Sequence, residues 1–215
     1  MARSGWLNTV YVSKPVPLVT APPLTMACFF NPSLFSGSDN IPMCVGGTAD
    51  ANMLDLQVPI AVKQAWAESG AASTYSHSAE TQTAMVVGTW YHIAAVFASN
   101  TSRLVYRNGV AGTLDTTSIA ITPANLTQTF VGKSPSSGNN ASHGSIAWAG
   151  FWNIDLSASD IMSLSQGRSP KRVRPGNIIG CPLMTGAVIA EVDPVSLVWT
   201  IAGAITETAN PPIYF

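Results

Sequence analysis

The stretch GTWYHIAAVFASNTSRLVYRNGVAGT, residues 88–113, decides the fold class. In WYHIAAVFA both alternate sets of side chains are largely apolar, which is typical of a strand covered on both faces. RLVYRNG alternates instead, with Leu104 and Tyr106 on one side and a valine between two arginines on the other. Asn108-Gly109 suits a type I′ turn, which needs positive φ at both central residues. The stretch therefore predicts a meander of three short antiparallel strands.

Further short strands are predicted on both sides of this meander. Apolar or alternating runs of strand length recur and are separated by Pro, Gly, Ser and Asn. They are TVYVS (9–13), PLTMACFFNP (23–32), MLDLQV (53–58), IAVKQAWA (60–67), TTSIAIT (116–122), TQTFVG (127–132), SIAWAGFWNI (145–154), IIGCPLMTG (178–186), GAVIAEV (186–192) and SLVWTIAG (196–203). This series predicts an all-β protein whose two antiparallel sheets pack as a jelly-roll sandwich.

One short helix is predicted near residues 157–166. Ser157 suits the N-cap, and Asp160 three residues later gives an acidic variant of the capping box. Gly167 suits the position just after the helix. The buried side of the helix is expected to consist of Ile161 and Leu164, with Met162 beside them.

The 215 residues show no break in composition that would mark a second domain. We expect residues 1–166 to form the jelly-roll core. We expect residues 167–215, a basic connector followed by strands, to pack on the same domain. A single all-β domain of this length is common.

The composition predicts a mostly neutral surface. Only 10% of the residues are charged, whereas 47% are hydrophobic. Such a surface suits a chain that packs against copies of itself or a larger partner, and a closed ring such as a trimer is one arrangement. The net charge of −1 gives no field that would attract nucleic acid or a membrane, so we expect neither as a partner. No apolar run reaches the length of a membrane span.

A local exception is a basic segment that holds four of the ten cations. These are Arg168, Lys171, Arg172 and Arg174. One interpretation is a solvated connector, which is the usual role of a charge run. The other is a docking strip for an acidic neighbour.

The three cysteines predict no zinc site and no redox centre, because their spacings are long. They are Cys28, Cys44 and Cys181. No apolar leader follows Met1, so we expect free, buried thiols in a chain that folds in the cytosol.

Several motifs follow one another in a fixed order between about residues 22 and 164. They are a Trp-x-His strand, a Tyr-x-Asn-Gly hairpin, a Val-Gly strand, and a Gly-x-Ile strand that continues through Trp-Asn into a Leu-Ser helix start. Their positions are Trp90, His92, Tyr106, Asn108, Gly109, Val131, Gly132, Gly144, Ile146, Trp152, Asn153, Leu156, Ser157, Asp160 and Ile161. In this series the chain resembles the laminin-G-like and pentraxin-like branch of the concanavalin A-like jelly rolls. The resemblance implies that the meander is scaffold, with the rings of Trp90, Tyr106 and Trp152 in the core between two sheets.

The C-terminal part of the chain resembles the extension of laminin-G-like proteins from tailed bacteriophages. The residues concerned are GRSPKRVRPGNIIGCPLMTG (167–186) and the ending NPPIYF (210–215). This resemblance implies a protein of the virion.

Catalysis is not expected. Some relatives of the fold are glycosidases, which need two carboxylates about 5 Å apart. The nearest match, Glu191-Val-Asp193, lacks the further Glu of the glucanase motif, so we predict that the chain is not an enzyme. His92 is expected in the core, whereas His77 and His143 lie in segments typical of loops and are too scattered for a metal site.

No metal or other cofactor is expected. Two loops offer oxygen ligands, Asp39 with Asn40 and Asp50 with Asn52. Neither loop is dense in carboxylates, so turn chemistry explains both. Calcium held by backbone carbonyls stays open, because such ligands leave no trace in a sequence.

Two functions fit these observations. The first is a structural virion protein, assembled in the host cytoplasm, that decorates or cements a phage capsid by binding shell proteins. The second is a tail-associated adhesin that binds a host glycan. Its candidate binding residues are Trp66, Tyr75 and His77, which lie in the stretch that least resembles the family.

Overall fold

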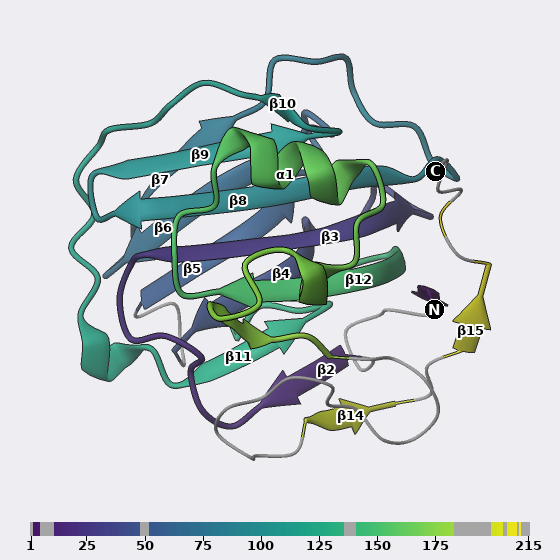
Figure 1. Cartoon of the computed structure of the whole chain (residues 1–215). Coiled ribbons are helices and arrows are strands. Elements are labelled where there is room, and N and C mark those ends of the chain that lie inside the picture. The colour runs from purple at the N-terminus through teal and green to yellow at the C-terminus, as the bar shows by residue number, and fades with distance from the viewer. Residues whose placement is uncertain are drawn as a thin grey trace.

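The computed structural model describes residues 2–4, 11–47, 52–135, 141–182, 199–203, 206–209 and 211. These residues form two antiparallel sheets packed face to face, with one short helix on the outside (Figure 1). The structure confirms the predicted all-β jelly-roll sandwich.

The first sheet has eight strands and carries the helix on its outer face (Figure 1). Its order is β10-β9-β8-β3-β12-β1-β15, and β13 also pairs with β12. The strands are β1 (Ala2–Ser4), β3 (Leu24–Pro32), β8 (Tyr91–Ser99), β9 (Ser102–Arg107), β10 (Val110–Ala111), β12 (Gly144–Trp152), β13 (Ile178–Gly180) and β15 (Thr206–Thr208).

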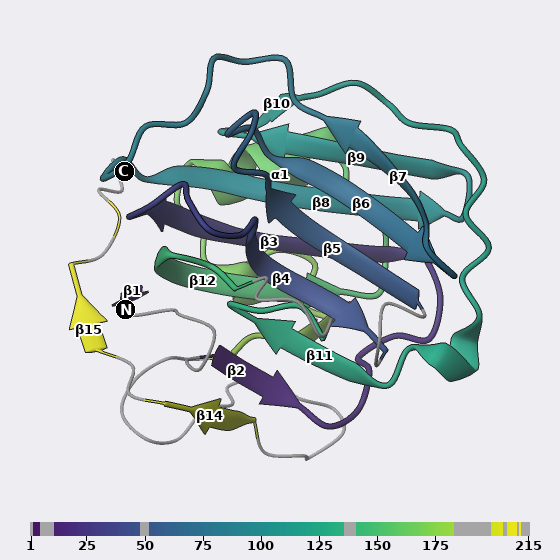
Figure 2. The same cartoon turned by 180° about the vertical axis from the view of Figure 1, so that it is seen from behind.

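The second sheet has seven strands in the order β14-β2-β11-β4-β5-β6-β7. Figure 2 shows its outer face toward the viewer, with none of the described helices across it. The strands are β2 (Tyr11–Lys14), β4 (Asn40–Gly46), β5 (Asn52–Val58), β6 (Trp66–Ala71), β7 (Thr74–Ala79), β11 (Gln128–Val131) and β14 (Thr200–Ala202).

The main core lies between the two sheets and follows the period-2 alternation of the strands. On β5, Leu54, Leu56 and Val58 are fully buried in this core. The intervening side chains of β5 therefore face the outer side of the seven-stranded sheet, where the candidate site lies.

Two arginines of β9 also point into the sandwich. Arg103 is fully buried, pairs with Asp115, and donates from Nε to Ser69 Oγ of the opposite sheet at 3.0 Å. Arg107 Nε lies 2.8 Å from a carboxylate oxygen of Glu80. The alternation of the β9 sequence is thus as predicted, and the arginines can lie on the inner face because each guanidinium has a carboxylate partner.

A second cluster fills the space between the eight-stranded sheet and α1 (Ala158–Ser165). Trp152 is fully buried there and donates from Nε1 to the Val173 carbonyl at 2.8 Å. Tyr106 belongs to the same cluster. Trp90 is only partly buried and packs against Phe29 on the outer face of the sheet. The prediction that these three rings lie between the sheets is wrong. Tyr106 and Trp152 alternate outward on their strands, toward the helix, and Trp90, which precedes β8, packs on the cluster of Phe29 and Ala147.

The local predictions hold where short-range chemistry decides the structure. Asn108 and Gly109 have φ of 50° and 81°, as a type I′ turn requires. Ser157 and Asp160 form a reciprocal capping box at the start of α1. Met162, which was expected beside the buried residues of the helix, is 40% exposed.

Several parts of the described chain differ from the predictions. Residues 116–122 form no strand, although Ile119 and Ile121 are buried in the core. A strand was predicted over residues 60–67, but β6 begins only at Trp66. Four strands, β1, β4, β7 and β15, were not predicted, because none of their sequences shows a clear apolar alternation.

The two ends of the described chain meet in both sheets. β2 pairs with β14 in the seven-stranded sheet, and β1 pairs with β15 in the other. Strands of the 167–215 segment thus extend sheets built by the rest of the chain, while the predicted division at residue 166 stays a prediction. Among the helices of the described ranges, none is long and apolar enough to cross a membrane.

Two further short helices, η2 (Pro123–Asn125) and η3 (Pro170–Arg172), lie in connections. In η3, buried Pro170 sits at the first position, where the missing N–H has no cost. This turn fixes the backbone of the basic segment against β12.

Candidate functional site

A flat stack of two rings marks the outer face of the seven-stranded sheet. Trp66 of β6 and His77 of β7 lie with ring centroids 3.6 Å apart and planes 4° from parallel. In the strand register Trp66 pairs with Ala79 and His77 with Glu68, so the two rings are diagonal neighbours across the strands. Diagonal neighbours on one face of a sheet are within reach of aromatic side chains.

Tyr75 lies beside the stack and is 43% exposed. Its strand partner is Gly70. A Cβ added to Gly70 would lie 2.6 Å from two carbon atoms of the Tyr75 ring. The ring therefore lies close over the backbone of β6, in space that only a glycine leaves open.

A small pocket of about 250 Å³ opens next to these rings. Ile41 and Met53 supply buried apolar lining. The other lining residues are Asp39, Gln57, Trp66, Glu68 and Tyr75. The pocket thus combines aromatic surface with two carboxylates and one amide.

The strand register explains how this set is assembled. Antiparallel pairing of β5 and β6 places Gln57 opposite Trp66. Glu68 is two residues beyond Trp66 and so faces the same side of the sheet. The pairing of β4 with β5 changes register between Asn40 and Met43, so β4 is irregular at its first residues, next to the pocket.

The Glu68 carboxyl is held in an environment that disfavours its charge. Burial raises the pKa of Glu68 to about 7, the nearby Asp39 carboxylate adds to the rise, and a hydrogen bond from Gln57 lowers it. Burial also lowers the pKa of His77, whose Nδ1 lies 3.9 Å from Glu68 Oε2. Near neutral pH the pocket therefore holds a carboxyl that readily exchanges a proton beside a neutral imidazole.

The structure brings together all three candidate residues from the sequence, Trp66, Tyr75 and His77. The expectation that His77 lies in a loop is wrong, because it is part of β7. The sequence did not single out Glu68 or Gln57 as members of the site. Period-2 alternation along each strand could have placed Glu68 on the same face as Trp66, and Gln57 on the same face as Met53. The pairing of β5 with β6, which brings the two sets together, is not visible in a sequence.

The two loops considered for calcium serve the fold where they are described. Asp39 Oδ1 accepts the Ile60 N–H at 2.8 Å, and Asn52 Oδ1 accepts the Thr122 N–H at 2.6 Å. Asn40 Oδ1 accepts the His143 N–H at 2.5 Å. Asp50 lies outside the described residues. Across the described ranges, no three His, Cys, Asp or Glu side chains gather in a way that could hold a metal ion.

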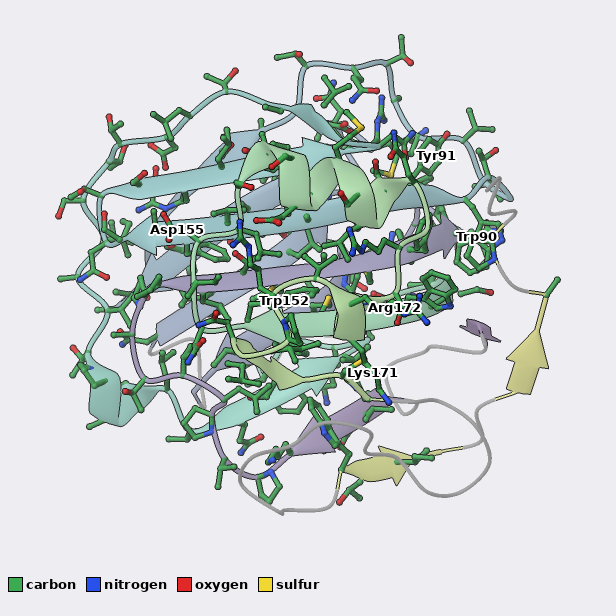
Figure 3. The ribbon with its side chains drawn as sticks, in the orientation of Figure 1. Trp90, Tyr91, Trp152, Asp155, Lys171 and Arg172 are labelled. Carbon is green, nitrogen blue, oxygen red and sulfur yellow. The ribbon has the colours of Figure 1, made fainter. Side chains whose placement is uncertain are left out.

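The basic segment divides into two parts. Arg174 Nε lies 3.0 Å from Asp160 Oδ2 and so neutralises the helix cap. Arg168 and Arg172 line a separate hollow on the helix face of the molecule, opposite the sheet that carries the pocket. Figure 3 shows Lys171 and Arg172 on this helix face.

The residues weighed for catalysis give no paired arrangement in the described part of the chain. Glu191 and Asp193 lie outside the described residues. Cys28 is buried, and burial raises the pKa of its thiol, so this sulfur stays protonated. The buried His92 ring packs against Phe29 at 5.2 Å, and burial lowers the pKa of His92 to about 3.

A comparison with protein families identifies the fold family. The model described as "Concanavalin A-like lectin/glucanases superfamily", of the laminin G type, matches residues 8–162. The chain belongs to this superfamily. Lectins and glucanases both carry its name, so membership alone does not separate binding from catalysis.

Solved structures of other concanavalin A-like proteins share the fold at low sequence identity. A heptameric SAP-like pentraxin from Limulus polyphemus has a TM-score of 0.61 at 12% identity, over 92% of this chain and 87% of that one. A putative carbohydrate binding protein from Bacteroides ovatus has a TM-score of 0.68 at 17% identity, over 98% of this chain and 61% of that one. Domain 4 of an extracellular arabinanase from Geobacillus stearothermophilus, solved with arabinotriose, has a TM-score of 0.59 at 18% identity, over 72% of each chain.

No curated protein matches the chain in sequence. Two of these neighbours are described by carbohydrate binding or by a carbohydrate ligand, and at this identity the likeness to them shows the fold alone. None of these comparisons points to a phage, so the virion location stays a prediction.

Proposed function

We propose that this concanavalin A-like protein binds a neutral glycan, without cleaving it, in the pocket beside Trp66, His77 and Tyr75. The observation that carries the proposal is the ring group on the open face of the seven-stranded sheet, set against Glu68 and Gln57. The Bacteroides protein and the arabinanase domain support it as relatives in fold.

The chemistry of the pocket suits a sugar ring. The partly exposed Tyr75 ring offers a face on which the C–H side of a sugar can pack. Gln57 supplies a donor and an acceptor, and the carboxyls of Glu68 and Asp39 accept from hydroxyl groups. The volume of about 250 Å³ is below the range of about 300–1,000 Å³ typical of drug-sized ligands. The pocket therefore fits one sugar unit of a longer glycan.

Binding without hydrolysis is the better proposal because the pocket carboxylates have other tasks. Asp39 Oδ1 is engaged by the backbone of Ile60 and so anchors a loop. Glu68, with a pKa raised to about 7, is about half protonated near neutral pH, so Asp39 is the other carboxylate that a two-carboxylate mechanism would need. Release of reducing ends from arabinan or another neutral polysaccharide would contradict this part of the proposal.

The direct test is binding of neutral oligosaccharides, first on a glycan array that includes arabinotriose and then by calorimetry with the best ligand. We expect Tyr75→Ala to weaken binding about tenfold or more, because the stacking surface is lost. We expect Gly70→Ala to do the same without removing any ligand contact, because its Cβ displaces the Tyr75 ring.

The matched control is Met162→Ala, which shortens a side chain of similar exposure, 40%, on the opposite face. Its affinity should equal that of the unmodified protein. Unchanged affinity in both Tyr75→Ala and Gly70→Ala would place the glycan elsewhere on the molecule.

Where such binding serves the organism is a separate matter. The predicted role on a phage particle, as a decoration protein or as a tail adhesin, is tested by the copy number of the chain in gradient-purified particles. A number close to that of the shell protein supports capsid decoration. A few copies support an adhesin, and absence from particles contradicts both.

A further inference from the structure

A second hollow, of about 740 Å³, lies on the helix face of the molecule. It is lined by Trp148, Ser163, Gln166, Gly167, Arg168, Ser169 and Arg172. We propose that this hollow is a second binding site, specific for an acidic saccharide whose carboxylate or sulfate group pairs with Arg168 and Arg172 while a sugar ring packs on Trp148. This site lies on the other outer face from the pocket at Tyr75 and does not depend on it.

Trp148 reaches this face through a β-bulge. Between the pairs Ala147↔Phe29 and Gly150↔Ala27, the single residue Cys28 of β3 faces both Trp148 and Ala149 of β12. The extra residue places Ala147 and Trp148 on the outer side in succession, while Ala149 stays in the core. Bulges that redirect a side chain in this way are frequent next to functional sites.

The backbone of Trp148 is strained. Its φ is +53°, in the left-handed region that bulky side chains rarely adopt. The ring is only partly buried and meets Phe29 edge to face at 6.0 Å. Since a partly buried ring gains less from burial than a fully buried one, the strain is better explained by a ligand than by packing.

The two arginines are held by rigid local structure. Gly167, with φ of +91°, ends α1 in a Schellman turn, in which its N–H bonds to the Leu164 carbonyl and the Arg168 N–H to the Ser163 carbonyl. Arg172 ends the η3 turn that follows. Figure 3 shows Arg172 on the helix face, with the acidic Asp155 at the far end of α1.

Neither arginine side chain is needed as a hydrogen-bond donor to the carbonyl groups at the end of α1. The Schellman bonds use the carbonyls of Ser163 and Leu164, and the Gln166 N–H uses that of Met162. Within the described residues no carboxylate pairs with Arg168 or Arg172, whereas Arg174 is paired with Asp160. The lining residues carry no acidic group. The hollow thus presents donors to an acceptor-rich ligand, and two guanidinium groups favour planar anions.

The choice of a saccharide over an acidic protein rests on the shape of the site. A protein neighbour held by charge alone needs exposed cations but no strained tryptophan beside them. An aromatic ring flanked by polar donors along a hollow is a usual arrangement for binding a small ring-shaped ligand. Carboxylate and sulfate sugars share this chemistry, so both are included as probes.

The test measures affinity for oligogalacturonate, a heparin oligosaccharide and a neutral oligosaccharide of equal length. We expect one of the acidic probes to bind at least about tenfold more tightly than the neutral one, with affinity falling as salt rises from about 0.05 to 0.3 M. Arg168→Ala/Arg172→Ala should lose this binding. Trp148→Ala should weaken it about tenfold.

The matched control is Lys171→Ala/Arg174→Ala. It also removes two positive charges, but from residues that do not line the hollow. It should bind the acidic probe as the unmodified protein does, and so should Tyr75→Ala, which separates this site from the neutral-glycan pocket. Equal loss in both double variants, or unchanged binding in Trp148→Ala, would show attraction to net charge only. Equal affinity for a poly-glutamate peptide of the same charge would show an acidic protein as the partner. Either result overturns the proposal.

Discussion

Glu68 is the residue of the proposed glycan pocket whose pKa is shifted most clearly from its ordinary value. It is a largely buried carboxyl whose neighbours are another carboxylate, an amide and a neutral imidazole. A buried carboxyl near a like charge holds its proton more tightly than in water. The stability of the protein and the protonation of the pocket are therefore linked through one residue.

We predict that Glu68→Gln flattens the pH dependence of stability. The folded-state pKa of about 7 exceeds the ordinary 4.5, so the proton-linked stabilisation is fully present below about pH 4.5 and is lost as the pH rises to 7. The amide of the variant cannot ionise. The difference in the free energy of unfolding between the variant and the unmodified protein should therefore shift by roughly 1–3 kcal/mol in favour of the variant between pH 4.5 and pH 8. Urea unfolding of both proteins at the two pH values measures this. Parallel pH profiles would mean that Glu68 titrates normally in the folded state.

The helix α1 shows how an element of eight residues is held in place by its ends. Its capping box closes the first turn, its Schellman turn closes the last, and only Ile161 and Leu164 are buried. So short a helix is not stable alone, and its caps contribute a large share of what fixes it. Asp160 at the first end also pairs with Arg174, and the turn at the other end holds the backbone of Arg168, a member of the proposed acidic-saccharide site.

We predict that Ser157→Ala lowers the free energy of unfolding by about 1 kcal/mol, because the Asp160 N–H loses its acceptor. Ser157→Thr should keep nearly all of the free energy of unfolding of the unmodified protein, because threonine also caps a helix. The control is Ser165→Ala, whose hydroxyl bonds a carbonyl within the last turn and contributes little. A Ser157→Ala protein as stable as the control would show that packing alone fixes the start of the helix.

The elements also show which parts of this structure can be predicted from sequence. The hairpin at Asn108-Gly109 and the helix at Ser157 were predictable because neighbouring residues decide them. Residues 116–122 look like a strand, but Ile119 is buried while its N–H bonds a loop carbonyl, that of Asn100. β7 was missed because TYSHSA has no apolar alternation.

The candidate sites were only partly predictable for the same physical reason. The rings of the pocket were named from the sequence by residue type, and the structure places them together, whereas Glu68 and Gln57 join them through strand pairing across the sheet. Trp148 was counted as one more strand residue, since a bulge depends on the register with β3. Contacts that arise from register cannot be read from one chain segment at a time.

At the scale of the whole molecule, one aromatic ring of the main core, that of Trp199, comes from the C-terminal part of the described residues. Trp199 is 3% exposed and belongs to the main core, with its ring 6.1 Å from that of Phe151. It precedes β14, the strand that covers the edge of β2.

We predict that Trp199→Ala lowers the free energy of unfolding by about 3–5 kcal/mol, the usual cost of removing a large buried ring. The exposed Met162→Ala should change it by less than about 0.5 kcal/mol. Denaturant unfolding followed by far-UV circular dichroism distinguishes the two. A loss below about 1 kcal/mol for Trp199→Ala would mean that this end of the chain only lies on the sandwich.

The pairing of β2 with β14 and of β1 with β15 has a consequence for synthesis on the ribosome. Each of these early strands pairs on one side with β11 or β12, but its other side stays unpaired until about 190 further residues have been made, as the positions of the paired strands show. Until then the nascent chain displays an open edge on each sheet, which can pair with another unfinished chain. The final closure also joins segments far apart in the sequence, which slows folding. Cells that make this protein quickly are therefore expected to hold it on a chaperone until translation ends.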